Sequence, residues 1–171
     1  MIKRIVRNLT PPIIYKVLSK IYHHIKTSDD KLFDGNDELF KSIIKKDDIY
    51  GEYGCGKSTL WVSKNFNIQI YSVESSIIWK NKVFKNIKNK EKCEIHHANI
   101  GEIGSWGRPK DYKNEKLFNN YTDWMWVQRF KPTVVLVDGR FRVCCFLTSL
   151  INGKEGDKIV FDDYNNRGFY H

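Results

Sequence analysis

The chain has 171 residues and a formal net charge of +9, and 41% of its residues are hydrophobic. This length predicts one main domain with a hydrophobic core of its own. The basic residues are spread along the chain, which favours a solvated lysine-rich surface over a nucleic-acid groove and predicts no nucleic-acid partner.

Residues 1–30 combine a basic start with an apolar stripe at helical spacing. Pro11 and Pro12 are typical of the first turn of a helix. The stripe consists of Ile13, Ile14, Val17, Leu18, Ile21, Tyr22 and Ile25. Two interpretations stay open: a helix that packs on the main domain, and an interfacial helix that Lys and Arg draw to anionic lipid. We predict a basic amphipathic helix in residues 1–30 and the main domain in residues 31–171.

Cysteine spacing and hydropathy bear on the compartment. The four cysteines show no C-x-x-C spacing, so reduced thiols are expected. The sequence shows no signal peptide and no membrane-spanning segment. The predicted location is the cytoplasm, with peripheral contact at the inner face of the membrane through the N-terminal helix as a further hypothesis.

The main domain is expected to begin with a short helix from Glu38 to Lys46, capped by Asn36 or Asp37. Its expected buried residues are Leu39, Phe40, Ile43 and Ile44. The next stretch, residues 48–62, joins a short apolar run to glycines at positions 51, 54 and 56 and then to a helical pattern that continues to about Lys64. Strand, glycine turn and helix in this order are typical of the nucleotide site of a Rossmann-type fold.

Strands and helices alternate along the rest of the chain. Strands are expected at 68–74, 92–97, 133–137 and 158–161, with helices after Ser75 or Ser76 and over 143–150. A polar loop at 101–120 is long enough for a lid or substrate loop. The alternation predicts a mostly parallel sheet with helices on both faces, whose ligand binds at the carboxyl ends of the strands. The polar residues expected at those ends are Glu52, Glu74, Asn99, Asp138, Asp162 and Asp163.

The glycine stretch fits two motifs at once. From Gly51 the letters GEYGCGKS match the phosphate-binding P-loop, in which Lys57 reaches phosphates and Ser58 holds magnesium. Asp138, after the run Val134 to Val137, would then bind that magnesium. From Glu52 the same letters read E-x-G-x-G, which resembles the first motif of class I S-adenosylmethionine (SAM) methyltransferases. That resemblance implies that Glu52, Gly54 and Gly56 contact the methionine part of SAM.

Physical arguments favour the methyltransferase interpretation. A carboxylate at Glu52 repels the polyanion that a P-loop surrounds, whereas it suits the sulfonium and ammonium groups of SAM. Glu74 ends the next strand about 22 residues after Glu52, close to the roughly 20 expected for an acid that binds ribose hydroxyls. The P-loop interpretation gives Glu74 no role.

Longer segments carry the same resemblance. From about Lys31 to the end, the segments LFDGNDELF, YGEYGCGKSTLWVS, YSVESS, VDGRFRVCCFL and VFDDYNNRGFYH resemble class I SAM-dependent methyltransferase-like proteins of the type found with bacterial surface-polysaccharide genes. The resemblance implies a Rossmann-like three-layer fold, SAM as cofactor, and adenine recognition by Asn99. The last two strands usual in this class are absent after the fifth strand, and Lys57 stands where many relatives have a small residue.

The strand-end aspartates suggest a metal. This pattern resembles that of metal-dependent O-methyltransferases. Those enzymes hold Mg²⁺ with carboxylates at the ends of the fourth and fifth strands. By that resemblance, Asp138, Asp162 and Asp163 are candidate Mg²⁺ ligands, and Asp138 and Asp162 are candidate catalytic groups. The alternative is that they are ordinary carboxylates, one of them paired with Arg140 or Arg142.

Three function classes stay open. The first is a methyltransferase that acts on a sugar or another small hydroxylated substrate. The second is a P-loop nucleotide-binding protein, and the third is a non-catalytic Rossmann-fold module in glycan assembly. An exposed sheet edge after the fifth strand also predicts a homo-oligomer in which another subunit covers it.

Overall fold

The computed structural model describes residues 31–33 and 37–170 of the chain. The fold described here is that of residues 37–170. The predicted N-terminal helix of residues 1–30, and the membrane contact predicted for it, lie outside the described residues. No helix in the described part is long and apolar enough to cross a membrane.

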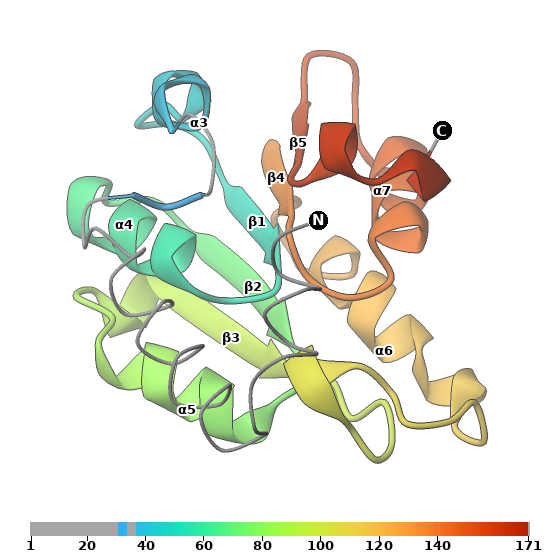
Figure 1. The fold of residues 1–171 in the computed structure, drawn as a ribbon. Coiled ribbons are helices and arrows are strands. Elements are labelled where there is room, and N and C mark those ends of the chain that lie inside the picture. The colour runs from blue at the N-terminus through green and yellow to red at the C-terminus, as the bar shows by residue number, and fades with distance from the viewer. Residues whose placement is uncertain (1–30, 34–36, 171) are drawn as a thin grey trace, which may run out of the picture. The chain divides into compact units, whose positions relative to one another are not determined.

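A five-stranded parallel sheet forms the centre of the domain (Figure 1). Its strands follow the order β3-β2-β1-β4-β5, and every neighbouring pair is parallel. Their bounds are β1 Tyr50–Tyr53, β2 Ile70–Glu74, β3 Cys93–His97, β4 Val134–Val137 and β5 Lys158–Phe161. The predicted Rossmann-like α/β fold is therefore confirmed, and β5 is the last strand of the sheet among the described residues.

Helices cover both faces of this sheet, as predicted. Their bounds are α3 Glu38–Ile43, α4 Lys57–Asn65, α5 Ile77–Lys85, α6 Asn119–Thr122 and α7 Arg142–Asn152. In Figure 1, α4 and α5 lie on one side of the sheet, and α6 and α7 lie on the other. Short 3-10 turns complete the described elements, at Lys90–Lys92, Ser105–Gly107, Glu115–Leu117, Trp124–Trp126, Tyr164–Asn166 and Gly168–Tyr170.

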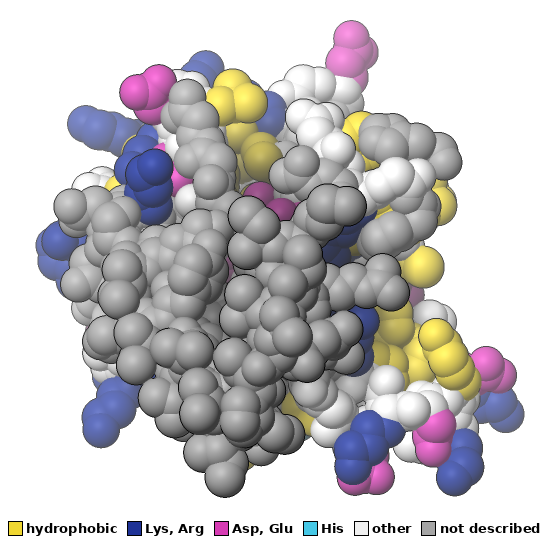
Figure 2. All heavy atoms as spheres, viewed as in Figure 1, with side chains coloured by type: hydrophobic (Ala, Val, Ile, Leu, Met, Phe, Trp, Pro, Cys, Tyr) yellow, Lys and Arg dark blue, Asp and Glu magenta, His cyan; other side chains and the backbone are white. Residues whose placement is uncertain are grey.

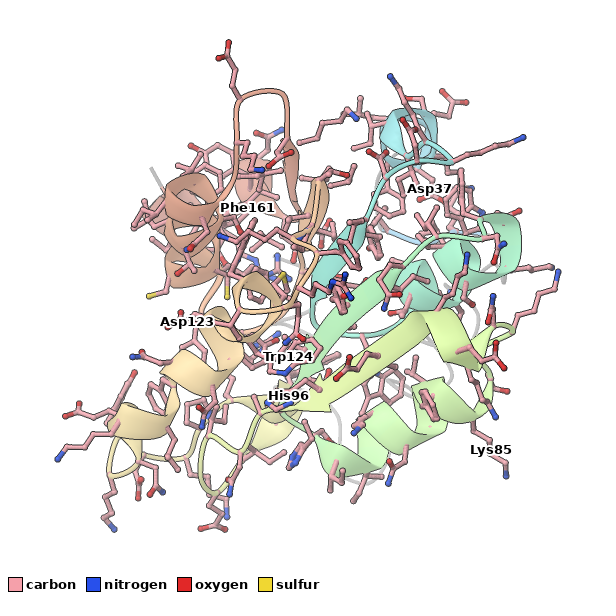
Figure 3. The ribbon with its side chains drawn as sticks, turned by 180° about the vertical axis from the view of Figure 1, so that it is seen from behind. Asp37, Lys85, His96, Asp123, Trp124 and Phe161 are labelled. Atoms are coloured by element: carbon pink, nitrogen blue, oxygen red, sulfur yellow. The ribbon has the colours of Figure 1, made fainter. Side chains whose placement is uncertain are left out.

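The strands are buried because helices cover both of their faces. Every residue of β1, β2 and β4 is buried. The core beside α6 and α7 joins Tyr53 and Val137 of the sheet to Tyr121, Trp126 and Cys145. Aromatic packing extends it to the β3 edge, where the rings of His96 and Trp124 stack at 4.8 Å between centroids (Figure 3).

Two local predictions need correction. The first helix ends at Ile43 rather than Lys46, and Leu39, which was expected to be buried, is 68% exposed. This helix has six residues and turns one narrow face inward, so Phe40 packs on the rings of Tyr50 and Trp61 while Leu39 points away. The stretch at 101–120 is mostly loop, as predicted, and a bridge between Ile103 and Pro109 closes a small hairpin within it.

Charged side chains are distributed over the visible surface. Figure 2 shows Lys and Arg at separate places on this face, with Asp and Glu among them. This distribution agrees with the solvated lysine-rich surface expected from the sequence.

Candidate active site

The candidate site lies at the carboxyl ends of the strands, next to the boundary between β1 and β4. At this boundary the order in which successive strands are added to the sheet changes direction. The glycine loop, residues 54–56, joins β1 to α4. Gly54 has a φ of +90°, and a Cβ added there would lie 2.7 Å from the Cα of Gly139. A Cβ added to Gly56 would meet no atom of the described residues within 4 Å. The turn after β1 is thus packed tightly against the turn after β4, while the backbone at Gly56 is open to a ligand.

Glu52 lies inside β1 and its side chain is turned under α4. It is 0% exposed, and its two carboxylate oxygens accept hydrogen bonds from the hydroxyls of Ser58 and Thr59. Burial raises the pKa of Glu52 to about 7, although these hydroxyls favour the ionised form. Glu52 therefore fixes the first turn of α4 behind the glycine loop, and its carboxylate does not face the ligand side of that loop.

The same contacts bear on the P-loop alternative. Gly51, the first residue of that motif, lies within β1, so only residues 54–56 form the turn. Ser58, which would hold magnesium, is buried and donates its hydroxyl to Glu52. A P-loop needs a longer loop whose N–H groups surround the phosphates. The geometry does not build one here.

Glu74 is the last residue of β2 and faces the glycine loop. Its Oε1 accepts a hydrogen bond from the backbone N–H of Ser76 at 2.8 Å, and the hydroxyl of Ser75 lies 3.4 Å from the same oxygen. Among the described residues, its Oε2 has only the thiol of Cys55 as a partner, at 3.9 Å. Burial raises the pKa of Glu74, and these hydrogen bonds lower it. One oxygen is thus held by the chain, while the other has room for a stronger donor.

A second contact ties the end of β2 to the glycine loop. The indole N–H of Trp79, in the first turn of α5, donates to the carbonyl of Cys55 at 2.7 Å. This bond holds the glycine loop beside Glu74 and brings together two of the features that the sequence predicts for SAM. Asn99 follows Ala98, whose N–H donates to the carbonyl of Glu74 at 3.0 Å; the side chain of Asn99 is exposed, and its Oδ1 accepts from the N–H of Gly101 at 3.1 Å in a local turn.

Arg142 joins the ends of β4 and β5. Its side chain is 7% exposed, and all five guanidinium N–H donors have acceptors. The acceptors are the carbonyls of Gly139, Asp138 and Asp162 and the carboxylates of Asp138 and Asp163. The shortest contact to a carboxylate is 2.6 Å, from Nη2 to Asp138 Oδ1. Asp163 also pairs with Arg167.

The predicted Mg²⁺ ligands do not fit a divalent cation in this arrangement. Asp138, Asp162 and Asp163 do lie together, as predicted, but the guanidinium of Arg142 occupies the place between them. A divalent ion needs several of these oxygens at about 2.0–2.6 Å, and Arg142 already uses them. Among the described residues no group of three or more metal-binding side chains is arranged to hold an ion. The arginine pair that the sequence offered as the alternative is the one the structure contains.

Asp138 and Asp162 form a coupled acid pair beside this arginine. Burial and the neighbouring carboxylate of Asp162 raise the pKa of Asp138, while Arg142 lowers it. Charge balance explains the direction, since three carboxylates share the two guanidiniums of Arg142 and Arg167. A proton held by Asp138 offsets the remaining negative charge.

The comparisons with known proteins agree with this geometry. A methyltransferase-like protein from Silicibacter pomeroyi has a crystal structure that superposes with a TM-score of 0.67 at 30% sequence identity, covering 78% of this chain and 73% of that chain. The chain belongs to the methyltransferase-like proteins. No protein-family model matches this methyltransferase-like chain, and no curated protein matches it.

Some residues of this methyltransferase-like site were not predicted from the sequence. Tyr121 lies on α6, and its hydroxyl accepts the backbone N–H of Arg140 at 3.1 Å. Gly107 packs on Ser75, whose hydroxyl donates to the Gly107 carbonyl at 3.0 Å. Nothing near Tyr121 or Gly107 in the sequence signals these contacts. The sequence offers Arg140 and Arg142 equally as partners of the aspartates, and helical spacing does not select Arg142, because Asp138 lies before α7 begins at Arg142.

Proposed function

We propose that this chain is a SAM-dependent methyltransferase that transfers a methyl group to a hydroxyl of a sugar or another small hydroxylated compound. The observation that carries the proposal is the pairing of Glu74 with the open backbone of the glycine loop at one edge of the sheet. The similarity to a methyltransferase-like protein supports it. We include a glycan as acceptor because the sequence resembles proteins found with surface-polysaccharide genes.

The residues at this edge suit SAM. Gly56 leaves space beside its backbone, where a bulky ligand can approach closely. Glu74 keeps Oε2 for the ribose hydroxyls, since Ser75 and Ser76 engage only Oε1. Glu52 acts from behind the loop by fixing α4 through Ser58 and Thr59. When bound, SAM supplies an electrophilic methyl group on its sulfonium.

We assign Asp138 and Asp162 to the proton of the acceptor hydroxyl. Arg142 fixes the main chain beneath both residues, so the acid pair has a defined position. In its ionised form, Asp138 would take the proton of a bound acceptor hydroxyl as a general base. The remaining requirement is in-line placement of the oxygen and the methyl group.

Isothermal titration calorimetry of Glu74→Ala tests the ligand assignment. SAM affinity should fall by about tenfold or more, because the ribose loses a charge-assisted hydrogen bond. Glu94→Ala is the matched control, since Glu94 is exposed on β3. Wild-type affinity for SAM in the Glu74 variant would sink the assignment. Binding of SAM without transfer to any hydroxylated acceptor would instead favour the non-catalytic module.

A further inference from the structure

Arg140 is a strand-end cation with which no side chain among residues 31–33 and 37–170 forms an ion pair. Its backbone is fixed, because its N–H donates to Tyr121 Oη at 3.1 Å and its carbonyl accepts from Cys145 Sγ at 3.2 Å. Its guanidinium has no ion pair or hydrogen bond with any of the residues in the described part. Arg142, two residues on, has all five of its donors filled.

The surroundings of Arg140 favour an anion. The side chain is half-buried, and burial is the largest cause that lowers the pKa of Arg140; the charges of Arg142 and Arg108 lower it further, while Tyr121 and Asp138 raise it. A partly buried guanidinium with empty donors lacks the partners that usually accompany such a charge. An incoming carboxylate or phosphate would supply them, and its two oxygens match the planar fork of an arginine.

The start of α7 adds to the same positive potential. Its N-cap residue, Phe141, makes no side-chain cap, and its first turn holds no acidic residue. Such a terminus keeps free N–H groups and a partial positive charge, which stabilise a nearby anion. The helix has 11 residues, enough for this effect to be established.

Arg140 directly follows Gly139, which packs on the glycine loop, because a Cβ added to Gly54 would lie 2.7 Å from the Cα of Gly139. Its charge lowers the pKa of Glu74, although the two side chains form no ion pair. The cation and the carboxylate therefore belong to one site without neutralising each other. A ligand between them would offer hydroxyls to Glu74 and an acidic group to Arg140.

We propose that Arg140, together with the N-terminus of α7, binds a carboxylate or phosphate group of the ligand at this edge. The anion has two sources within the proposed function: the carboxylate of SAM, or an acidic group on the acceptor. The inference rests on that function for the identity of the ligand, and it specifies the chemistry of recognition.

Calorimetry with two methyl donors separates the sources. Wild type and Arg140→Gln are titrated with SAM and with decarboxylated SAM, which has the same adenosine, sulfonium and amine without the carboxylate. If the donor supplies the anion, Arg140→Gln binds SAM about tenfold or more weakly and binds decarboxylated SAM like wild type. Arg129→Gln is the control, because Arg129 is exposed and lies at the opposite, amino end of β4.

Inorganic phosphate tests the acceptor source. With SAM present, phosphate should raise the unfolding temperature of wild type and of Arg129→Gln, and this rise should be lost in Arg140→Gln if an acidic acceptor group binds there. Arg140→Lys keeps the charge without the planar fork and should show a partial loss; it also serves if the Gln variant fails to fold.

The outcomes separate the two claims. Arg140→Gln and Arg140→Lys that match wild type toward both donors and toward phosphate would overturn the anion site. A wild type that ignores both donors would overturn the proposed function, and the phosphate response would still decide whether Arg140 binds an anion.

Discussion

Two groups of buried acids differ in what holds them. Glu52 lies inside β1, forms no ion pair with a described residue, and is held by two hydroxyls of α4. Asp138 follows the end of β4, and the guanidinium of Arg142 holds it together with the acids that follow β5. The difference shows that an acid inside a strand serves the packing of the next helix, whereas an acid past the strand end can join a site.

Replacement of Arg142, the cation that holds the strand-end aspartates, should have the largest effect on stability. Arg142→Met leaves three carboxylates near one another without their shared partner, so the free energy of unfolding should fall by about 3–5 kcal/mol. Urea denaturation measures this loss. Arg129→Met is the control and should stay within about 0.5 kcal/mol of wild type, because Arg129 is exposed. A loss below about 1 kcal/mol for Arg142→Met would show that the clamp is not a structural requirement.

Asp138→Asn tests the catalytic part of the same group. Methyl transfer should fall by about 10²–10⁴-fold while SAM affinity stays within about twofold, because the acid pair loses its base but the glycine loop is untouched. The pKa of Asp138 is raised to about 8, so the wild-type rate should rise with pH up to that region as the proton leaves. Asp111→Asn, on the exposed loop, is the control. A flat rate between pH 6 and 9 would contradict the assignment.

For the first group, Glu52→Gln should change how stability depends on pH. The folded pKa of about 7 exceeds the ordinary value of 4.5, so the folded state holds this proton more tightly than the unfolded chain. The resulting stabilisation is complete below about pH 4.5 and is lost as the pH rises through about 7. Gln does not titrate, so urea denaturation should show wild type losing on the order of 2 kcal/mol relative to the variant between pH 5 and 8. Parallel stability curves would contradict this account.

Thr59→Val is the smallest change. It removes one hydroxyl that donates to Glu52 while keeping the shape of the side chain, so a loss of about 1 kcal/mol is expected. The loss should grow as the pH rises above 7, because the hydroxyl favours the ionised carboxylate. Thr148→Val on α7, away from any carboxylate pair, is the control for the substitution itself. Equal losses for both variants at pH 8 would show that Glu52 does not depend on this donor.

The sequence predicted the sheet better than the site. The β-branched run at Val134–Val137 and the alternation of strands with helices were enough to predict a parallel sheet, and β5 has the predicted bounds. Burial of Leu39 was wrong because an apolar pattern does not say how wide a face a short helix turns inward. The place of Arg142 among the aspartates required the register of β4 on β5, which local patterns do not contain.

The direction of a side chain was the hardest feature to predict. Glu52 is the acid of the E-x-G-x-G pattern, and Glu74 is the predicted ribose-binding acid. The side chain of Glu52 is turned under α4, whereas that of Glu74 faces the glycine loop. The reason is position: Glu52 precedes the last residue of β1 and points from a sheet face, whereas Glu74 is the last residue of β2. A sequence-based prediction must therefore place each strand end to within one residue before it can tell in which direction such an acid points.

The most direct test of the central claim is the response of backbone amides to SAM in the ¹⁵N-labelled chain. Binding at the carboxyl edge predicts shifts of the Gly54 and Gly56 amides and of the Ser75 and Ser76 amides next to Glu74, at SAM concentrations that saturate. Amides of Lys131 and Thr133, at the amino end of β4, should stay unchanged. Shifts confined to that amino end, or no shifts at all, would contradict the account.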